Sequence, residues 1–588
     1  MMPAMRYLRL LTNAVAGGLV LSLYVVVLLL QLNPHLSPLS VTVGRWTGAV
    51  LAFYLPYLAV GLFLLLLGRD ALSRRPLRPA WLSVRLLAWV GALSAAGAAA
   101  ATWANLSAFE SMLTEAAAVR MRDGAWLTSL SALAMVVIAI ARYSFGRRGS
   151  RATGLLTIAT MSVSVGGPVW LRGPGETPVR PPTRWTNPVP TASPARVHVI
   201  ALDGASLGFI RQRIAAGQLP NLARMLDRGA VMDLATVRPT ETGPVWAAAA
   251  TGRLAPSTGI RSNWTYRVRD DDPEAVDILP DYCFTSALVS QGFVRAVLQS
   301  SSSLQTRTLW DILGDYRVAV GVVNWPLTAP ARVRGTGYIL SDRFDEGAAS
   351  PFRLLDAGAG DPTTTVDIAR AHFDRWQGRD WFEVLSTFSR GEVQPPEVDR
   401  ARWDRAYSDA ALELERQFAP RFTAVRFESL DAFGHNFLRQ AQPELFGDPR
   451  WSVPIRPVLD RAYSYIDGEV GRAIRALSSA GGDTLVIVIS GFGMDPNPLG
   501  KRLLARLLGE PDTTGSHEQG PDGFLLAYGA NVANVELPRG SLADLAPTVL
   551  YYMGVPVSRD LDGVVRTDLF VPAYTAEHPV KYVSSHER

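Results

Sequence analysis

Five long apolar stretches in the first third of the chain constrain its fold more than any other feature. They cover residues Leu8–Leu32, Thr47–Leu67, Trp81–Trp103, Trp126–Ala141 and Gly154–Leu171. A helix needs about 20 mostly apolar residues to cross a bilayer, and each stretch approaches that length. A cleavable signal peptide would account for the first stretch alone. We therefore predict an all-α transmembrane domain of about five helices in residues 1–172, with the lipid bilayer as a partner.

The arginines between these stretches predict how the helices cross the membrane. Arginines cluster before the first stretch, between the second and third, and between the fourth and fifth, whereas the other two connections carry few. By the positive-inside rule the amino terminus is cytoplasmic, and an odd number of spans places the rest of the chain on the other side. We expect a multi-pass protein of the plasma (inner) membrane whose C-terminal domain is extracytoplasmic or periplasmic.

A proline-rich stretch marks the end of the apolar third. Residues 173–196 should form a semi-extended linker, residues 197–572 a globular domain, and residues 573–588 a tail. Cys283 is the only cysteine, which excludes an intrachain disulfide and a thiolate metal cluster. The net charge is +5, but no dense basic patch stands out in the globular part, so we expect no binding to a nucleic-acid polymer.

The globular part alternates short apolar strands with helices. The first strand, Val197–Leu202, is almost entirely apolar and is followed by Asp203 and Gly204. Further strands are expected at residues 318–323, 422–427, 485–489 and 524–528. Such alternation is typical of a mostly parallel sheet with helices on both faces. Because open α/β folds bind ligands at the carboxyl ends of their strands, Asp203 is a candidate ligand; alternatively, it only caps the next helix.

Other polar side chains stand at the ends of these strands. Thr242 follows one strand, Asp431 and His435 follow another, and His517 lies just before a third. With Asp203, the set comprises two aspartates and two histidines, which are ligands suited to zinc or manganese. A single loop histidine is more often solvated than bound to metal. The metal-site hypothesis therefore depends on the whole set.

The motifs around these residues resemble the type I phosphodiesterase/nucleotide pyrophosphatase branch of the alkaline phosphatase superfamily. The resemblance extends from about Val197 to Leu569. It implies an alkaline-phosphatase-like fold and a phosphate-ester substrate. The motifs that carry it are Leu202-Asp203-Gly204, Gly217–Leu222, Pro239–Pro244, Thr251-Gly252, Asn324–Thr328, Asp431–His435, Gly515-Ser516-His517 and Asp544–Pro556.

The resemblance also implies roles for the candidate residues. The family uses two metal ions bridged by the substrate phosphate, with a threonine or serine nucleophile bound to one of them. Thr242 matches the nucleophile, and Asp203 matches a ligand of the nucleophile-side ion. Asp431, His435 and His517 match the ligands of the other ion. The expected cofactor is a divalent metal, zinc or alternatively manganese, which would activate the weakly acidic threonine hydroxyl and hold it in line for attack.

The chain departs from the family pattern at the nucleophile-side ion. The family has Ser-Asp-His-Gly where this chain has Ser490-Gly491-Phe492-Gly493, so two metal ligands are replaced by residues that cannot bind metal. Val245 also stands where the family often has an asparagine. Only Asp203 and Thr242 remain for this ion. The sequence is therefore compatible with one or two bound ions.

Three functions remain open. The first, which we favour, is a membrane-anchored extracytoplasmic metal-dependent phosphoesterase or phosphodiesterase with a threonine nucleophile. It would work with one tightly held ion at Asp431, His435 and His517, and the nearby carboxylates Asp495 and Glu518 are candidates to repair the second ion site. The second is a transferase of phospho-groups to lipids or glycans, because the anchor resembles the layout of lipoteichoic acid synthases and phosphoethanolamine transferases. The third is a catalytically degenerate binding protein, because of Gly491-Phe492. The sequence indicates neither the substrate nor the oligomeric state.

Overall fold

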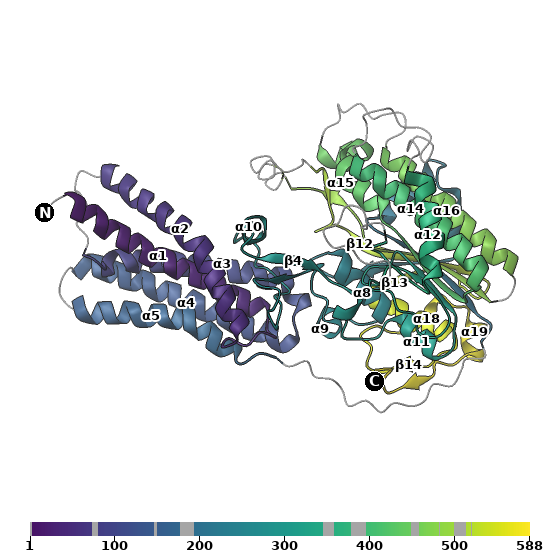
Figure 1. The fold of residues 1–588 in the computed structure, drawn as a ribbon, viewed down its shortest axis with the longest axis horizontal. Coiled ribbons are helices and arrows are strands. Elements are labelled where there is room, and N and C mark those ends of the chain that lie inside the picture. Colours follow the sequence, from purple (N-terminus) through teal and green to yellow (C-terminus); the bar gives the residue numbers. More distant parts are fainter. Residues whose placement is uncertain are drawn as a thin grey trace. The chain divides into compact units, whose positions relative to one another are not determined.

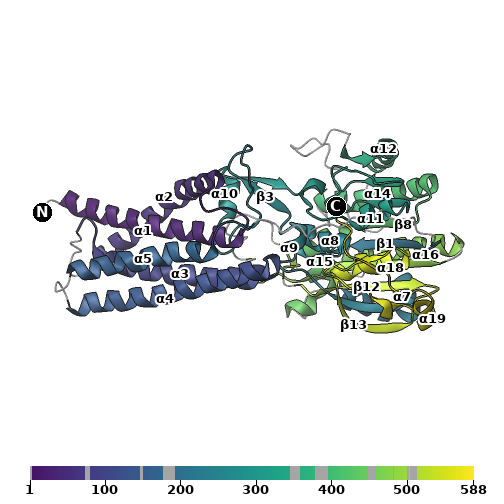
Figure 2. The ribbon, with the colours of Figure 1, turned by 90° about the horizontal axis from the view of Figure 1, so that it is seen from below.

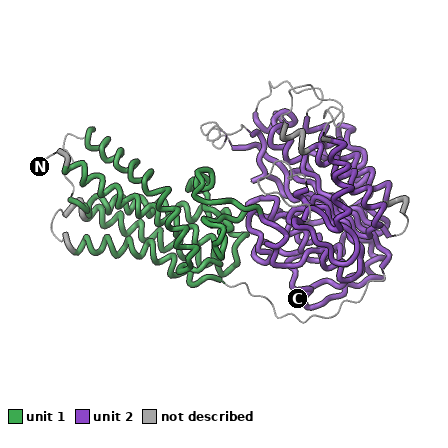
Figure 3. Tube along the Cα trace, in the orientation of Figure 1, with its two compact units in different colours: residues 1–181, 264–298 green, residues 182–263, 299–588 purple. Residues whose placement is uncertain are grey.

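The computed structural model divides the chain into two compact units (Figure 3). Unit 1 comprises Met1–Pro181 and Trp264–Leu298, and unit 2 comprises Pro182–Asn263 and Gln299–Arg588. Most of the linker expected at 173–196 lies outside the described residues. The described residues are 3–72, 80–145, 150–176, 193–344, 358–377, 395–447, 458–480, 483–498, 502, 513–518 and 520–587.

Five apolar helices form the amino-terminal part of unit 1 (Figure 1). Each is long and apolar enough to cross a membrane, and neighbouring helices pack side by side. The prediction of about five such helices is confirmed. They are α1 (Pro3–Leu32), α2 (Val41–Leu72), α3 (Val84–Phe109), α4 (Glu115–Phe145) and α5 (Ser150–Arg172).

A segment from much later in the sequence, Trp264–Leu298, completes unit 1. It contains the antiparallel strands β3 (Trp264–Arg267) and β4 (Arg295–Leu298), with helix α10 (Ser286–Ser290) between them. In the sequence alone this segment belongs to the expected 197–572 domain. In the structure its apolar side chains share a core with α1 and α2; the core residues include Val276, Leu288 and Val294 of the segment and Leu29, Trp46 and Phe53 of the helices.

Unit 2 is built on a nine-stranded sheet in the order β13-β2-β12-β9-β1-β8-β5-β6-β7. Strands β9, β1, β8, β5 and β6 are mutually parallel, and β12 is antiparallel to both of its neighbours. The predicted mostly parallel α/β sheet is confirmed. Its strands are β1 (Arg196–Leu202), β2 (Ala230–Ala235), β5 (Val320–Val323), β6 (Gly337–Leu340), β7 (Gly360–Asp361), β8 (Phe422–Phe427), β9 (Thr484–Phe492), β12 (Asp522–Gly529) and β13 (Val535–Ser541).

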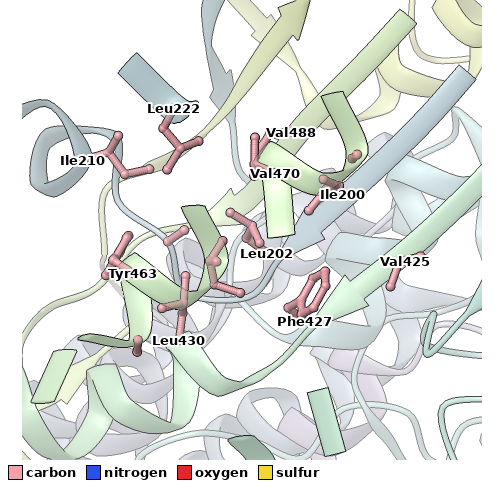
Figure 4. Close-up of a cluster of buried hydrophobic side chains, with 14 of the residues drawn as sticks. Ile200, Leu202, Ile210, Leu222, Val425, Phe427, Leu430, Tyr463, Val470 and Val488 are labelled. Carbon is pink, nitrogen blue, oxygen red and sulfur yellow. The ribbon is translucent and has the colours of Figure 1, made fainter. Parts of the chain in front are cut away.

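Helices cover both faces of this sheet (Figures 1 and 2). The central strand β1 is buried on both sides, which explains why it is apolar almost throughout. On one face, Ile200 and Leu202 of β1 pack with Phe427, Tyr463 and Val488 in the main core (Figure 4). That face carries α6 (Leu207–Ala215), α7 (Pro220–Arg228), α14 (Pro395–Phe418), α15 (Ser429–Ala441) and α16 (Val458–Ala480), and the other carries α8 (Thr242–Thr251), α11 (Leu309–Asp315) and α18 (Leu545–Tyr552).

Shorter elements complete unit 2. The end of the chain, expected as a tail at 573–588, contains α19 and β15, and β15 pairs with β14. Strands β10 and β11 form a two-stranded ribbon near the carboxyl end of β9. The bounds of these elements are α9 (Ala255–Thr258), α12 (Thr364–Gln377), α19 (Pro572–Glu577), β10 (Asp495–Pro496), β11 (Gly515–Ser516), β14 (Val557–Ser558) and β15 (Tyr582–Val583).

A buried aspartate explains the Pro-Asn-Leu sequence at the start of α7. The carboxylate of Asp467, on α16, accepts hydrogen bonds from the backbone N–H groups of Asn221 (3.0 Å) and Leu222 (2.8 Å) and from the Asn221 side chain (2.9 Å). The first N–H groups of a helix have no partner within the helix. Asp467 therefore caps α7 and ties it to α16.

We expect Asp467→Ala to lower the free energy of unfolding by about 1–3 kcal/mol, because it leaves these buried donors unpaired. Denaturant unfolding of the full chain in detergent, followed by tryptophan fluorescence, measures this effect. Asp367→Ala is a matched control on α12, since the Asp367 side chain is exposed. Equal stability of the two variants would contradict the capping role.

Candidate functional site

The candidate residues gather at the edge of the sheet where the parallel strands end. Strand β1 leads into Asp203, β8 leads through Glu428 into α15, and β9 ends at Phe492. Strand β12 runs the opposite way, so it begins at this edge, a few residues after His517. The sheet topology thus brings together residues that are far apart in the sequence.

Asp431, His435 and His517 lie close enough to bind one metal ion. One ligand atom from each lies within 4.8 Å of the others. The Nε2 atom of His435 is 3.6 Å from Asp431 Oδ2, and the Nε2 atom of His517 is 4.0 Å from Asp431 Oδ1. All three residues are half-buried. Two imidazoles and one carboxylate, with room for a further ligand, are a common donor set for catalytic zinc.

Helix α15 and its cap position two of these ligands. Asp431 and His435 are one turn apart on α15, so they share a face of the helix. Asp404 accepts hydrogen bonds from the backbone N–H groups of Glu428 (2.9 Å) and Ser429 (2.8 Å), which caps α15. The Nδ1 atom of His435 lies 2.9 Å from the carbonyl oxygen of Gly515. When Nδ1 donates to this oxygen, Nε2 is left as the metal-binding atom.

Close backbone contacts require glycine at two positions of the site. A Cβ atom at Gly515 would lie 2.3 Å from the carbonyl oxygen of Gly434, so a side chain would separate His517 from α15. Gly204 has φ +71°, and a Cβ atom there would lie 2.8 Å from the Cα of Asp431. These glycines allow the segments carrying His517 and Asp203 to approach α15.

The three ligands fit a divalent ion. The Oδ1 atom of Asp431 is buried and has no hydrogen-bond partner among the described residues. Burial lowers the pKa of His517, and the nearby Asp431 only partly offsets this effect. His517 is therefore neutral at pH 7, as a metal ligand must be. The backbone of Thr240 also contacts His517, which places the loop before Thr242 beside the cluster.

Two other carboxylates considered as substitute ligands, Asp495 and Glu518, do not belong to this cluster. Asp495 is exposed on β10. The ion would have to complete its coordination with water or with substrate oxygens. Such an incomplete set of protein ligands is typical of catalytic rather than structural sites.

Asp203 has different partners in the structure. The indole N–H of Trp246 donates to Oδ1, and the guanidinium of Arg426 donates to Oδ2. Asp203 is only 3% exposed. Burial raises its pKa to about 7, although the charge of Arg426 opposes this shift. Both carboxylate oxygens thus accept from protein donors, and the positive charge of Arg426 beside Asp203 opposes the binding of a second cation there.

Arg426 supplies a fixed positive charge at this position. It lies on β8 beside Ala201 of β1, and its guanidinium also donates to Glu428 and, at 2.7 Å, to the carbonyl oxygen of Asn324. Burial alone would lower its pKa, but Glu428 and Asp203 outweigh burial and raise it. Arg426 is not among the site residues predicted from the sequence. Its signal is an arginine within an otherwise largely apolar strand that is buried along its whole length.

Apolar side chains occupy the remainder of the nucleophile-side region. A Cβ atom at Gly491 would lie 2.2 Å from Cγ1 of Val245, so Val245 fills the space that a side chain at 491 would need. The buried ring of Phe492 lies 4.8 Å, centroid to centroid, from the ring of His517. With Asp203 paired to Arg426, these residues do not fit a second metal ion.

Thr242 is the first residue of α8 and is half-buried. Trp246 follows one turn later, so the hydroxyl lies on the face of α8 that binds Asp203 through the indole. The loop before α8 is fixed by Asn263, which accepts a hydrogen bond from Gly243 N–H (2.6 Å) and donates its own N–H to Glu241 (2.6 Å). The amino terminus of a helix favours negative charge, as a phosphate or an alkoxide would provide.

A cavity of about 360 Å³ lies at the opposite edge of the sheet, near the start of β1 and β8. Its lining includes His198, Glu415 and Thr423. Burial lowers the pKa of His198, and its Nδ1 atom lies 2.5 Å from the Thr423 hydroxyl. None of the candidate residues lines this cavity, so it does not provide the substrate site that the motifs indicate.

The family-model comparison agrees with the motifs. Residues 197–539 match the family model described as type I phosphodiesterase/nucleotide pyrophosphatase. No curated protein sequence matches the chain. Among solved structures, human ectonucleotide pyrophosphatase/phosphodiesterase 5 is 12% identical, with 64% of this chain and 99% of that chain covered and a TM-score of 0.37. Its murine counterpart is 13% identical, covers 64% of this chain and 100% of its own, and has a TM-score of 0.38.

A bacterial structure is also similar. Phosphonoacetate hydrolase from Sinorhizobium meliloti 1021, in complex with phosphonoformate, is 20% identical. The match covers 54% of this chain and 63% of that chain, with a TM-score of 0.32.

We expect Arg426→Met to lower the free energy of unfolding by about 3–5 kcal/mol, because it leaves buried carboxylates without their cation. Denaturant unfolding followed by tryptophan fluorescence measures the effect, and Trp246, Trp310 and Trp325, which form a buried cluster beside the pair, contribute to the signal. The control is Arg211→Met, since the pair of Arg211 with Glu536 is exposed and should contribute less than about 1 kcal/mol. Equal effects of the two variants would refute the importance of the buried pair.

Metal affinity should fall in acid, because a proton then competes with the ion for His517. The lowered pKa of His517 means that this ligand is unprotonated at pH 7 and becomes protonated only at a pH below that of an ordinary histidine. Calorimetric titration with zinc between about pH 7.5 and about pH 4 measures the trend. An affinity that is constant over this range would contradict histidine ligation.

Proposed function

Because the chain belongs to the type I phosphodiesterase/nucleotide pyrophosphatase family, we propose that unit 2 hydrolyses phosphodiester bonds with the help of a single divalent metal ion. The observation that carries this proposal is the grouping of Asp431, His435 and His517 at the carboxyl edge of the sheet. Open α/β folds bind their ligands at this edge of the sheet. Titratable residues with shifted pKa values also tend to lie at functional sites.

Asp431, His435 and His517 would hold the ion, which we propose to be zinc, with manganese as the alternative. A bound divalent ion would neutralise charge on the phosphate and make its phosphorus more electrophilic. The lowered pKa of His517 keeps this ligand ready for binding at neutral pH.

Thr242 is the proposed nucleophile. Its position at the first turn of α8 exposes an attacking oxygen to the helix terminus, where negative charge is favoured. Trp246 holds α8 against Asp203, and Asp203 is held by Arg426. We propose that Arg426 acts as a positioning residue, supplying the permanent positive charge that the resemblance assigns to a second ion.

The same observations favour one alternative, a catalytically degenerate protein that binds phosphorylated ligands. Asp203 is already paired, and Gly491 and Phe492 contribute no metal ligands. A metal-dependent binding protein would retain the ion at Asp431, His435 and His517 without turnover. For the membrane arrangement, we propose that α1–α5 cross the bilayer with the amino terminus in the cytoplasm and unit 2 outside it.

Metal analysis combined with turnover of a generic aryl phosphodiester tests the proposal. We expect one zinc ion per chain in the wild type, loss of that ion in His435→Ala and in His517→Ala, and retention of it in Thr242→Ala. The last variant should lose turnover because it lacks the attacking oxygen. His578→Ala is the matched control, since His578 lies on the exposed surface near α19, outside the cluster.

The outcomes separate the two functions. Metal without turnover in the wild type would indicate the binding protein. Turnover that is unchanged in Thr242→Ala would refute the nucleophile, and two tightly bound ions would refute the replacement of one ion by Arg426.

A further inference from the structure

Two aromatic side chains project from unit 1 in the turn between Asp281 and Thr285. Tyr282 is 74% exposed and Phe284 is 70% exposed. Both have left-handed backbone conformations, with φ of 63° and 56°. Bulky residues rarely adopt this conformation, and it persists only where surrounding contacts impose it. The turn therefore holds two large aromatic side chains in exposed positions, and it does so in a backbone conformation that such residues rarely adopt.

Hydrogen bonds fasten this turn to two of the apolar helices. The hydroxyl of Tyr54, on α2, donates to the carbonyl oxygen of Cys283 at 2.6 Å. The amide of Asn105, on α3, accepts from Asp281 N–H at 2.8 Å and donates to its carbonyl oxygen at 3.1 Å. Asn105 is completely buried. The aromatic pair is thus at a fixed height along α2 and α3.

Charged residues on these helices indicate what that height is. Arg45, near the start of α2, pairs with Asp271 and Asp272 of the inserted segment, so this level lies in water. Tyr54 is about 14 Å further along α2. On α3, Arg85 and Asn105 are about 30 Å apart, which is the thickness of the hydrocarbon core. If Arg85 lies at one surface, the turn at 281–284 lies at the boundary of the opposite leaflet.

The helix surface nearby has the character expected at that boundary. On α2, Tyr57 is exposed one turn after Tyr54, and the exposed apolar surface continues through Val60 and Leu64. The spacing of these residues defines one face of α2. Tyrosine and tryptophan side chains are enriched where membrane helices meet the headgroups. Tyr282 and Phe284 therefore extend a surface whose other members are suited to contact lipid.

We propose that Tyr282 and Phe284 insert into the phospholipid bilayer at the boundary between headgroups and acyl chains, so that a segment from the phosphodiesterase-family region contacts lipid directly. This inference rests on the proposed crossing of the bilayer by α1–α5. The hydrogen bonds from Tyr54 and Asn105 hold the two rings at this depth. The charged pairs of Arg45 remain in the aqueous phase.

Photo-crosslinking of the wild-type chain tests the proposal without any substitution. The protein is placed in nanodiscs of phosphatidylethanolamine and phosphatidylglycerol that contain a phospholipid with a diazirine near the carbonyl end of its acyl chain. Mass spectrometry then locates the lipid adducts. We expect adducts on the peptide that contains Tyr282 and Phe284. Adducts confined to α1–α5 would overturn the inference and leave the membrane anchor intact, whereas adducts on neither would overturn both.

Fluorescent labelling gives an independent measurement. Cys283 is the only cysteine, so Cys283→Ala provides a background in which Tyr282→Cys or Phe284→Cys carries a polarity-sensitive fluorophore. In nanodiscs, we expect both labels to emit at shorter wavelength than a label at Asp270→Cys, and brominated acyl chains to quench them. Asp270 is a matched control because it is exposed in the same segment and pairs with Arg295. Emission and quenching equal to those of the control would refute insertion.

Discussion

The buried ion pair between Arg426 and Asp203 is the interaction on which the arrangement of the site depends. A charge removed from water must be matched by hydrogen-bonding partners, and here the partners come from several elements. Arg426 joins β8 to β1, and Glu428 joins it to the start of α15. The carboxylate of Asp203 also accepts from Trp246, which fixes the first turns of α8. The proposed nucleophile and the metal ligands are therefore oriented by one network.

This network also changes the chemistry available at the site. A metal ion can dissociate or exchange with another ion. The guanidinium of Arg426 is part of the chain, so its positive charge is always present. The packing of Val245 against the Cα of Gly491 removes the room for an added carboxylate. Restoring a second ion would require changes at several positions together. Val245 occupies the space that a side chain at position 491 would need, and Arg426 places a positive charge beside Asp203.

The sequence predicted the fold well because its signals are local. The apolar strand β1 followed by Asp203 and Gly204, and the length of the five apolar helices, can be read from neighbouring residues. The proposed metal ligands could be named from the order of their motifs. The partners of Asp203 could not be predicted, because Arg426 is 223 residues away and the local sequence does not determine which strands are neighbours in the sheet. Without the strand order, the sequence does not indicate which carboxylate pairs with the arginine in β8.

The assignment of the inserted segment, residues 264–298, to unit 1 could not be predicted for the same reason. Asn33 hydrogen-bonds to Ile278 across 245 residues, and the mixture of polar and apolar residues between 264 and 298 resembles an ordinary surface insertion. Because of this segment, the chain passes between the two units at three places rather than one. A single proteolytic cut between residues 173 and 196 would consequently not separate unit 2 from unit 1. Separation of unit 2 from unit 1 would require two further cuts, on either side of the segment that remains packed among the helices.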